Sequence, residues 1–272
     1  MDINIEQLKT EVKEQLKGKY MKVVLLVFIT NLISLLLNLL GTQVNANNMI
    51  FGLLSFITSL IMIVVNYIVQ FVFLKIARGQ KLNQEDIAFG FRRIFTIIGS
   101  ALLITILSTL VLMIAAVFLG PIWIAYMIAS YMIQLFFFML QGVIAYGIYD
   151  GSNGVFDALK GAYKLIKRHY KPFLACTILY FLVNIVLSLG LNIFITSTFD
   201  GIKAVVNIDT ALIYSFSHDL GIFMLLVGIY AGTQFVSSIM LPFVYLSYAN
   251  IYEKSNKEQF FNYNPKYQVS IK

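Results

Sequence analysis

The chain of 272 residues contains little charge and almost no cysteine or histidine. Charged residues make up 12% of it and apolar residues 59%, whereas soluble domains carry about 25% charged residues. This deficit excludes an ordinary soluble protein and favours a polytopic membrane protein. The single cysteine, Cys176, excludes an internal disulfide and a thiolate metal cluster.

The scarcity of titratable groups also limits the chemistry that the chain can perform. All 13 acidic residues fall in expected loops or at the ends of expected membrane spans. We therefore expect no catalytic residue, no metal ion and no cofactor. His169 and His218 are assigned to opposite sides of the membrane, so they cannot share a proton or a metal. An ion-coupled pump is disfavoured, because such proteins usually keep ionisable residues at membrane depth.

Long apolar runs predict an all-α fold with six transmembrane helices, arranged as three hairpins. The expected spans are residues 21–40, 49–77, 93–119, 121–149, 172–196 and 221–248. Each reaches the roughly 20 residues that are needed to cross the hydrocarbon core. Residues 1–252 are expected to form a single membrane domain, and residues 253–272 a mobile or loosely docked tail.

The basic residues predict the orientation of this domain. Of the 20 basic residues, 19 lie before residue 23, at 75–93, at 160–171 or in the last 19 residues. The exception is Lys203. These segments all fall on one side of a six-span protein. The positive-inside rule then places both termini in the cytoplasm. The net charge of +7 therefore reflects topology, and we expect no nucleic-acid partner.

An amphipathic stretch at residues 150–171 organises the chain. An apolar stripe with helical spacing is formed by Phe156, Leu159, Tyr163, Ile166 and Tyr170. A basic stripe follows one residue later, at Lys160, Lys164, Lys167 and Lys171. Such a helix rests its apolar side in a membrane interface and directs its amines toward anionic headgroups. Residues 2–19 repeat the pattern, with Ile5, Leu8, Val12 and Leu16 as the apolar stripe.

From these stripes we expect lipid contacts on the cytoplasmic side. The candidate anionic-lipid contacts are Lys13, Lys17, Arg92, Arg93, Lys160, Lys164, Lys167, Arg168 and Lys171. The expected partner is a bilayer with anionic headgroups. Other membrane proteins or an amphipathic peptide are further candidate partners.

An internal repeat connects three such stretches. Each contains an acid and, four residues later, a glycine: Glu14 and Gly18, Asp86 and Gly90, Asp157 and Gly161. The shared register indicates three units, at about 2–77, 82–149 and 153–252, each an interfacial helix followed by a two-span hairpin. The glycine would allow a bend or a close approach, and the acid would lie near a helix start. Spans four and six also end alike, in Ile148-Tyr149-Asp150 and Ile251-Tyr252-Glu253.

The polar residues inside the expected spans are uncharged. The candidate intramembrane cluster is Asn66, Gln70, Gln141, Asn184 and Gln234. Such amides either form hydrogen bonds between helices or line a cavity for an amphipathic ligand. We favour hydrogen bonding between helices, which is the commoner role.

Several short motifs carry a family resemblance. They are Leu16-Lys17-Gly18-Lys19-Tyr20, Ala77-Arg78-Gly79-Gln80, Phe89-Gly90-Phe91-Arg92-Arg93, Tyr146 to Asp150, Ala158-Leu159-Lys160-Gly161 and Ala249-Asn250-Ile251-Tyr252-Glu253. Together they resemble the bacterial integral-membrane family catalogued as "domain of unknown function 975", which is similar to the membrane domain of some glycerophosphoryl diester phosphodiesterases. The resemblance implies a six-span protein of the bacterial cell membrane. It implies no catalytic residue, and the phosphodiesterase domain of those enzymes has no counterpart here.

The sequence leaves two classes of function open. The first is a non-enzymatic membrane factor, such as a scaffold, regulator or immunity-type protein, that associates with lipids or other proteins. The second is a transporter or flippase-like protein for lipid or amphipathic peptide. The basic stretches favour the first, and the repeat with its amides favours the second.

Overall fold

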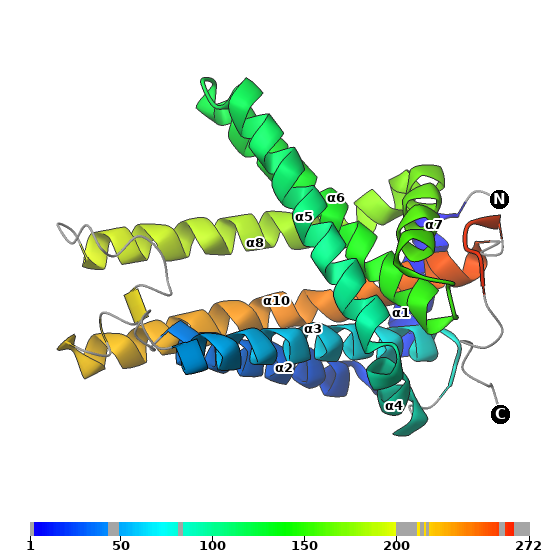
Figure 1. The fold of residues 1–272 in the computed structure, drawn as a ribbon, viewed down its shortest axis with the longest axis horizontal. Coiled ribbons are helices and arrows are strands. Elements are labelled where there is room, and N and C mark those ends of the chain that lie inside the picture. Colours follow the sequence, from blue (N-terminus) through cyan, green and yellow to red (C-terminus); the bar gives the residue numbers. More distant parts are fainter. Residues whose placement is uncertain are drawn as a thin grey trace. The chain divides into compact units, whose positions relative to one another are not determined.

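The computed structural model describes residues 3–42, 49–80, 84–199, 211–212, 215, 218–255 and 259–263, and within them it leaves undescribed the side chains of 35–42, 49–56, 84–87 and 123. The described part is almost entirely helical (Figure 1). In chain order the helices are α1 (Ile5–Leu16), α2 (Tyr20–Thr42), α3 (Met49–Ala77), α4 (Gln84–Arg92), α5 (Ile94–Leu119), α6 (Trp123–Tyr149), α7 (Val155–Arg168), α8 (Tyr170–Thr198) and α10 (Leu220–Lys254). A short helix thus precedes a pair of long helices three times.

Several of the long helices have the dimensions of membrane spans. Within the described residues, five are long and apolar enough: Ile57–Ala77, Ile94–Leu119, Ile124–Tyr149, Tyr170–Thr198 and Leu220–Lys254. This confirms a helical protein with several candidate spans. The described apolar part of α2, Tyr20–Ser34, is shorter than a span, and the side chains that follow it lie outside the described part. The sixth span therefore stays a prediction.

The chain divides into two compact units, which are described separately. The first comprises Met1–Lys19, Ile63–Ile178 and Phe243–Lys272, and the second comprises Tyr20–Met62 and Leu179–Pro242. Helices α3, α8 and α10 each contribute to both units.

Aromatic side chains fill the core of the first unit. Tyr67, Phe71, Tyr146, Phe173 and Tyr248 are among its largest fully buried residues. Their rings meet edge-on or tilted, as in Phe173–Tyr248 with centroids 5.1 Å apart. Aromatic side chains bury more surface than aliphatic ones and favour such geometries. This core joins the ends of α3, α6 and α10 with the start of α8.

Helix α1 lies against this core, which corrects one expectation. Leu8, Val12 and Leu16 are buried in protein and do not form an exposed interfacial stripe. The side-chain amide of Gln15 exchanges hydrogen bonds with Asn250 of α10, at 2.8 and 3.1 Å. The apolar stripe of α1 thus has a protein partner, which periodicity alone cannot distinguish from lipid.

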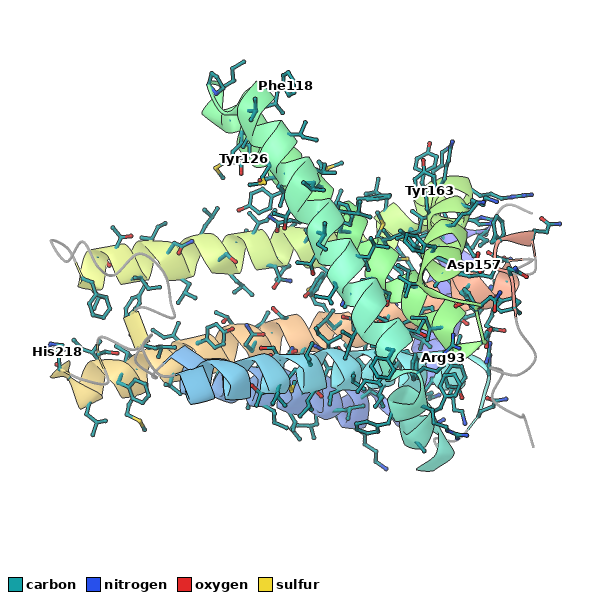
Figure 2. The ribbon with its side chains drawn as sticks, viewed as in Figure 1. Arg93, Phe118, Tyr126, Asp157, Tyr163 and His218 are labelled. Carbon is teal, nitrogen blue, oxygen red and sulfur yellow. The ribbon has the colours of Figure 1, made fainter. Side chains whose placement is uncertain are left out.

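The surfaces of α5 and α6 contrast with this core. The two helices pack against each other within the first unit (Figure 1). Toward the far end of α5, Met113, Ile114, Val117 and Phe118 are exposed, and α6 exposes Ile124 and Ile128. Figure 2 shows Phe118 directed away from the ribbon. An apolar surface of this kind suits contact with lipid.

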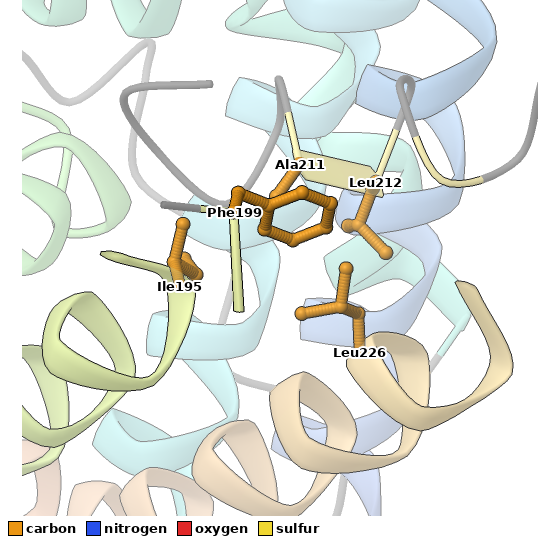
Figure 3. Packing of buried hydrophobic residues seen from close by; sticks show 5 residues of the cluster. All are labelled: Ile195, Phe199, Ala211, Leu212 and Leu226. Carbon is orange, nitrogen blue, oxygen red and sulfur yellow. The ribbon is translucent and has the colours of Figure 1, made fainter. Parts of the chain in front are cut away.

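The second unit is held by contacts between α2, α8 and α10. The Tyr20 hydroxyl donates to the Ile239 carbonyl at 2.7 Å, and the Asn31 amide donates to Ser238 Oγ at 3.2 Å. A small apolar cluster contains Ile195, Phe199, Ala211, Leu212 and Leu226 (Figure 3). Most of the long connection at 197–220 falls outside the described residues.

Candidate functional site

Helix α7 is fixed to the protein along one side. Ala158, Gly161, Ala162, Leu165 and Ile166 form its buried face, which packs against α5 and α6. Small residues on this face permit a close approach between helices. Asp157 lies in the first turn, and Lys167 and Arg168 lie in the last turn. These charges complement the helix dipole and stabilise α7.

The opposite side of α7 carries exposed aromatic and basic side chains. Phe156 is 75% exposed and Tyr163 48%, and Tyr170, just past the helix end, is 54% exposed. Figure 2 labels Tyr163 on this helix. Lys160, Lys164 and Lys167 of α7 are exposed as well, and so is Lys171 at the start of α8. The exposed apolar stripe contains fewer residues than the sequence predicted, because Ile166 is buried and Leu159 is half-buried.

The other candidate lipid contacts do not share one environment. Lys13, Lys17 and Arg92 are exposed, on α1 and at the end of α4. Arg93 is 7% exposed, and its Nη2 donates to the Ser152 carbonyl at 2.6 Å. The expectation that Arg93 contacts lipid is therefore wrong. A guanidinium buried between α4 and α5 instead satisfies a carbonyl of the loop between α6 and α7.

The repeat glycines have two different roles. Gly18 follows α1 with a φ of +75°, a conformation that glycine adopts without strain. Gly90 and Gly161 lie inside helices, where a Cβ at Gly90 would come within 2.7 Å of Ile68 Cγ1 and one at Gly161 would overlap the ring of Phe261. Close approach therefore explains the second and third glycines, and a chain turn explains the first.

The repeat acids likewise differ. Asp157 lies in the first turn of α7, where the dipole favours it. Asp86 lies in the first turn of α4, although its side chain falls outside the described part. Glu14 lies near the end of α1, so the expected helix-start position is wrong there. The three stretches thus share sequence spacing more closely than they share local structure.

An ionic cluster that the sequence did not reveal joins the ends of α3, α6 and α10. Arg78 Nη2 lies 2.6 Å from Asp150 Oδ2 and 2.6 Å from Glu253 Oε1, and Arg78 Nε donates to the same Glu253 oxygen at 2.9 Å. The side chains of Arg78, Asp150 and Glu253 are only 12%, 14% and 27% exposed. One guanidinium therefore links two carboxylates in a largely desolvated place.

Tyrosine hydroxyls extend this cluster. Tyr252 Oη donates to Asp150 Oδ2 at 3.0 Å and lies 2.7 Å from Tyr263 Oη. Burial would lower the pKa of Arg78, but the adjacent Asp150 and Glu253 carboxylates hold that pKa above its ordinary value. Burial raises the pKa of the Tyr263 hydroxyl, so it stays protonated. The cluster carries one more carboxylate than cation and is held together by fixed hydrogen bonds.

The cluster residues occupy similar sequence positions within the expected repeat. Arg78 follows Ile76-Ala77 as Asp150 follows Ile148-Tyr149 and Glu253 follows Ile251-Tyr252. The likeness of the second and third is visible in the sequence, whereas the first carries the opposite charge. At these three positions one guanidinium thus meets two carboxylates. A search for positions of complementary charge in one register could have found Arg78.

The candidate intramembrane amides do not share one role: the Asn184 side chain bonds to another helix, whereas Gln70 Oε1 is buried without a hydrogen-bond partner among the described residues. In the second unit, Asn184 donates to the Tyr180 carbonyl at 2.8 Å and accepts from Ser237 Oγ at 2.6 Å, which joins α8 to α10. In the first unit, Gln70 is 3% exposed, while Asn66 and Gln141 are half-buried. The carbonyl of Gln234 accepts from Ser238 Oγ at 2.7 Å. The Asn184 contacts are those of an interhelical hydrogen bond.

Chemically, these arrangements provide binding surfaces and structural ion pairs. Within the described part of the chain, no group of three histidine, cysteine or acidic side chains is placed to hold a metal ion. No family model, curated protein or solved structure matches the chain. The resemblance to the domain of unknown function 975 therefore stays a prediction.

Proposed function

We propose that this chain is a non-enzymatic multi-pass protein of a bacterial cell membrane that binds anionic lipid headgroups through α7. The observation that carries the proposal is the exposed face of α7, which carries Phe156, Tyr163 and three exposed lysines and is continued by exposed Tyr170 and Lys171 at the start of α8. The aromatic rings suit the boundary between headgroups and acyl chains, and the amines suit the phosphates above it.

The attachment of α7 to the protein strengthens this argument. A free amphipathic peptide must fold when it binds a membrane, whereas the buried face of α7 already fixes the helix. Each basic residue near an anionic surface contributes about 1 kcal/mol. Lys160, Lys164 and Lys167 together would thus contribute about 3 kcal/mol. Much of this is lost at high salt, since the Debye length is about 8 Å at physiological ionic strength.

The proposed topology has six spans in three units, with both termini in the cytoplasm. Its support is the recurrence of a short helix before two long ones, together with the confinement of nearly all cations to one side. The resemblance to the domain of unknown function 975 agrees with this arrangement. In this proposal α7 lies at the cytoplasmic surface, where anionic lipids are available.

The alternative, a transporter or flippase-like protein, has less support. It requires the amides within the spans to line a cavity. The described contacts of Asn184 instead connect α8 with α10. We therefore retain lipid and protein association as the proposed function.

The test compares two sets of lysine substitutions. Lys160→Gln/Lys164→Gln/Lys167→Gln neutralises α7, and the matched control Lys9→Gln/Lys13→Gln/Lys17→Gln removes the same charge from α1, whose apolar stripe is buried. Phosphatidylglycerol retained by the protein purified from mixed micelles is measured by mass spectrometry. We expect a large loss for the α7 set and a smaller loss for the α1 set. Equal losses would show that net charge alone acts, and would refute the role of α7.

A further inference from the structure

A short C-terminal segment, residues 259–263, docks on the first unit. It was expected to be mobile or loosely docked, but Phe261 is only 4% exposed. The segment is drawn in red beside α7 in Figure 1. Its contacts resemble those of a bound peptide, and it lies next to the basic face of α7.

The ring of Phe261 occupies a slot that two glycines create. Gly147 belongs to α6 and Gly161 to α7, and a Cβ on either would overlap the Phe261 ring. The ring also lies against Tyr252, with centroids 5.6 Å apart, and stacks on Tyr263 at 5.8 Å. The slot is thus shaped for one flat side chain, and it explains why a repeat glycine lies at position 161.

Main-chain pairing orients the segment. Asn153 N donates to the Asn262 carbonyl at 2.9 Å, and Ser152 forms an antiparallel bridge with Tyr263. An extended peptide held by one main-chain pairing and one side-chain pocket is a common recognition mode. Gln259 and Asn262 remain exposed, so one side of the segment faces away from the protein.

One contact connects the segment with the basic face of α7. The guanidinium carbon of Arg168 lies 5.9 Å from the centroid of the Phe260 ring. Arg168 is exposed in the last turn of α7, one residue after Lys167 and four after Lys164. The same side chain is therefore available either to Phe260 or to a headgroup phosphate.

We propose that residues 259–263 are an internal ligand of the slot between α6 and α7, and that they compete with anionic headgroups for Arg168. Headgroup binding draws the guanidinium from Phe260 and weakens the docked segment. By thermodynamic linkage, a docked segment weakens headgroup binding by the same factor. The identity of the competitor, an anionic headgroup, rests on the proposed function. The docking of residues 259–263 does not.

The experiment follows the segment by electron paramagnetic resonance in the full chain. A nitroxide is attached through Gln259→Cys in a Cys176→Ala background, and the protein is placed in nanodiscs. One set contains phosphatidylcholine, and the other contains phosphatidylcholine and phosphatidylglycerol in equal amounts. We expect an immobilised label in phosphatidylcholine and a larger mobile fraction with phosphatidylglycerol. Gly161→Ala should release the label in both, whereas Gly154→Ala is the matched control, since no atom lies within 4 Å of its Cβ position.

Three further variants keep the proposal testable if Gly161→Ala misfolds. Phe261→Ala should release the label without adding an atom to α7. Phe260→Ala should leave Phe261 in its slot and strengthen phosphatidylglycerol binding about threefold, the effect of one exposed cation–π contact. Arg168→Gln should make the label insensitive to phosphatidylglycerol.

The outcomes separate the two proposals. A label that stays immobilised with phosphatidylglycerol overturns the competition, even where the lysine substitutions reduce lipid retention. A label that is as mobile in the starting chain as in Phe261→Ala overturns the docking. If the lysine substitutions leave lipid retention unchanged while Gly161→Ala still releases the label, the proposed function fails and the docking stands.

Discussion

The substitution Arg78→Met should be among the most destabilising single changes to the described ionic residues. It removes the guanidinium that pairs with both Asp150 and Glu253 and leaves two carboxylates close together in a largely desolvated place. Removing one partner of a fully buried ion pair costs about 3–5 kcal/mol. Because these side chains retain 12–27% exposure, water screens part of that cost. We therefore expect a loss of about 2–3 kcal/mol in unfolding free energy.

The measurement is unfolding by sodium dodecyl sulfate in mixed micelles, followed by far-ultraviolet circular dichroism. The matched control is Lys254→Gln, which breaks the pair between Lys254 and Glu11, exposed by 37% and 41%. That change should cost about 0.5 kcal/mol. Adding Asp150→Asn and Glu253→Gln to Arg78→Met removes the stranded charges and should restore part of the stability. A loss for Arg78→Met no larger than that for Lys254→Gln would refute the reasoning, as would a triple variant less stable than the single one.

The remaining predictions concern the repeat and its cations. Arg93→Gln should cost about 2 kcal/mol in the same unfolding assay, because it leaves a buried carbonyl without its charged donor, whereas Arg92→Gln, at an exposed site, should cost less than about 0.5 kcal/mol. Equal costs would contradict the assignment of Arg93 to the interior. Gly90→Ala should cost about 1–3 kcal/mol through overlap with Ile68, and adding Ile68→Ala should recover part of that loss. A Gly90→Ala chain as stable as the starting chain would exclude close approach as the reason for this glycine.

The sequence predicted the helical class and much of the helix order. Residues 49–77 were expected as a span, and α3 has those bounds. The largest difference at a helix end lies in α10, which continues to Lys254 where the sequence indicated residue 248. Apolar length is a strong signal, because the thickness of the hydrocarbon core sets the length of a span. The sequence predicts the ends of helices less well, because a helix can continue beyond the membrane into a protein core.

Apolar periodicity predicted which helix faces are apolar, but not whether those faces contact protein or lipid. The spacing in α1 and α7 is similar, yet Leu8 and Val12 are buried in protein while Phe156 and Tyr163 are exposed. A stripe of apolar side chains reports that some apolar neighbour exists and does not report whether that neighbour is lipid or protein. In α7 the buried face is built from small residues such as Ala158 and Gly161, which a search for large apolar residues passes over.

The ionic cluster was missed for a different reason. Arg78 lies 72 residues from Asp150 and 175 from Glu253. Their pairing depends on how the ends of three helices meet, which no local pattern encodes. The docked position of Phe261 is similar, because a polar segment with scattered aromatics gives no sign that two distant glycines form a slot for one ring.

The depth of α7 in the bilayer tests the central claim most directly. Single nitroxides at Phe156, Lys160, Tyr163 and Lys164, each in a Cys176→Ala background, can be compared by power saturation with oxygen and with a water-soluble nickel complex. We expect stronger oxygen contact at the two aromatic positions and stronger nickel contact at the two lysine positions. If all four labels along α7 showed the same accessibilities, typical of a label in water, the proposed position of α7 in the interface would be contradicted.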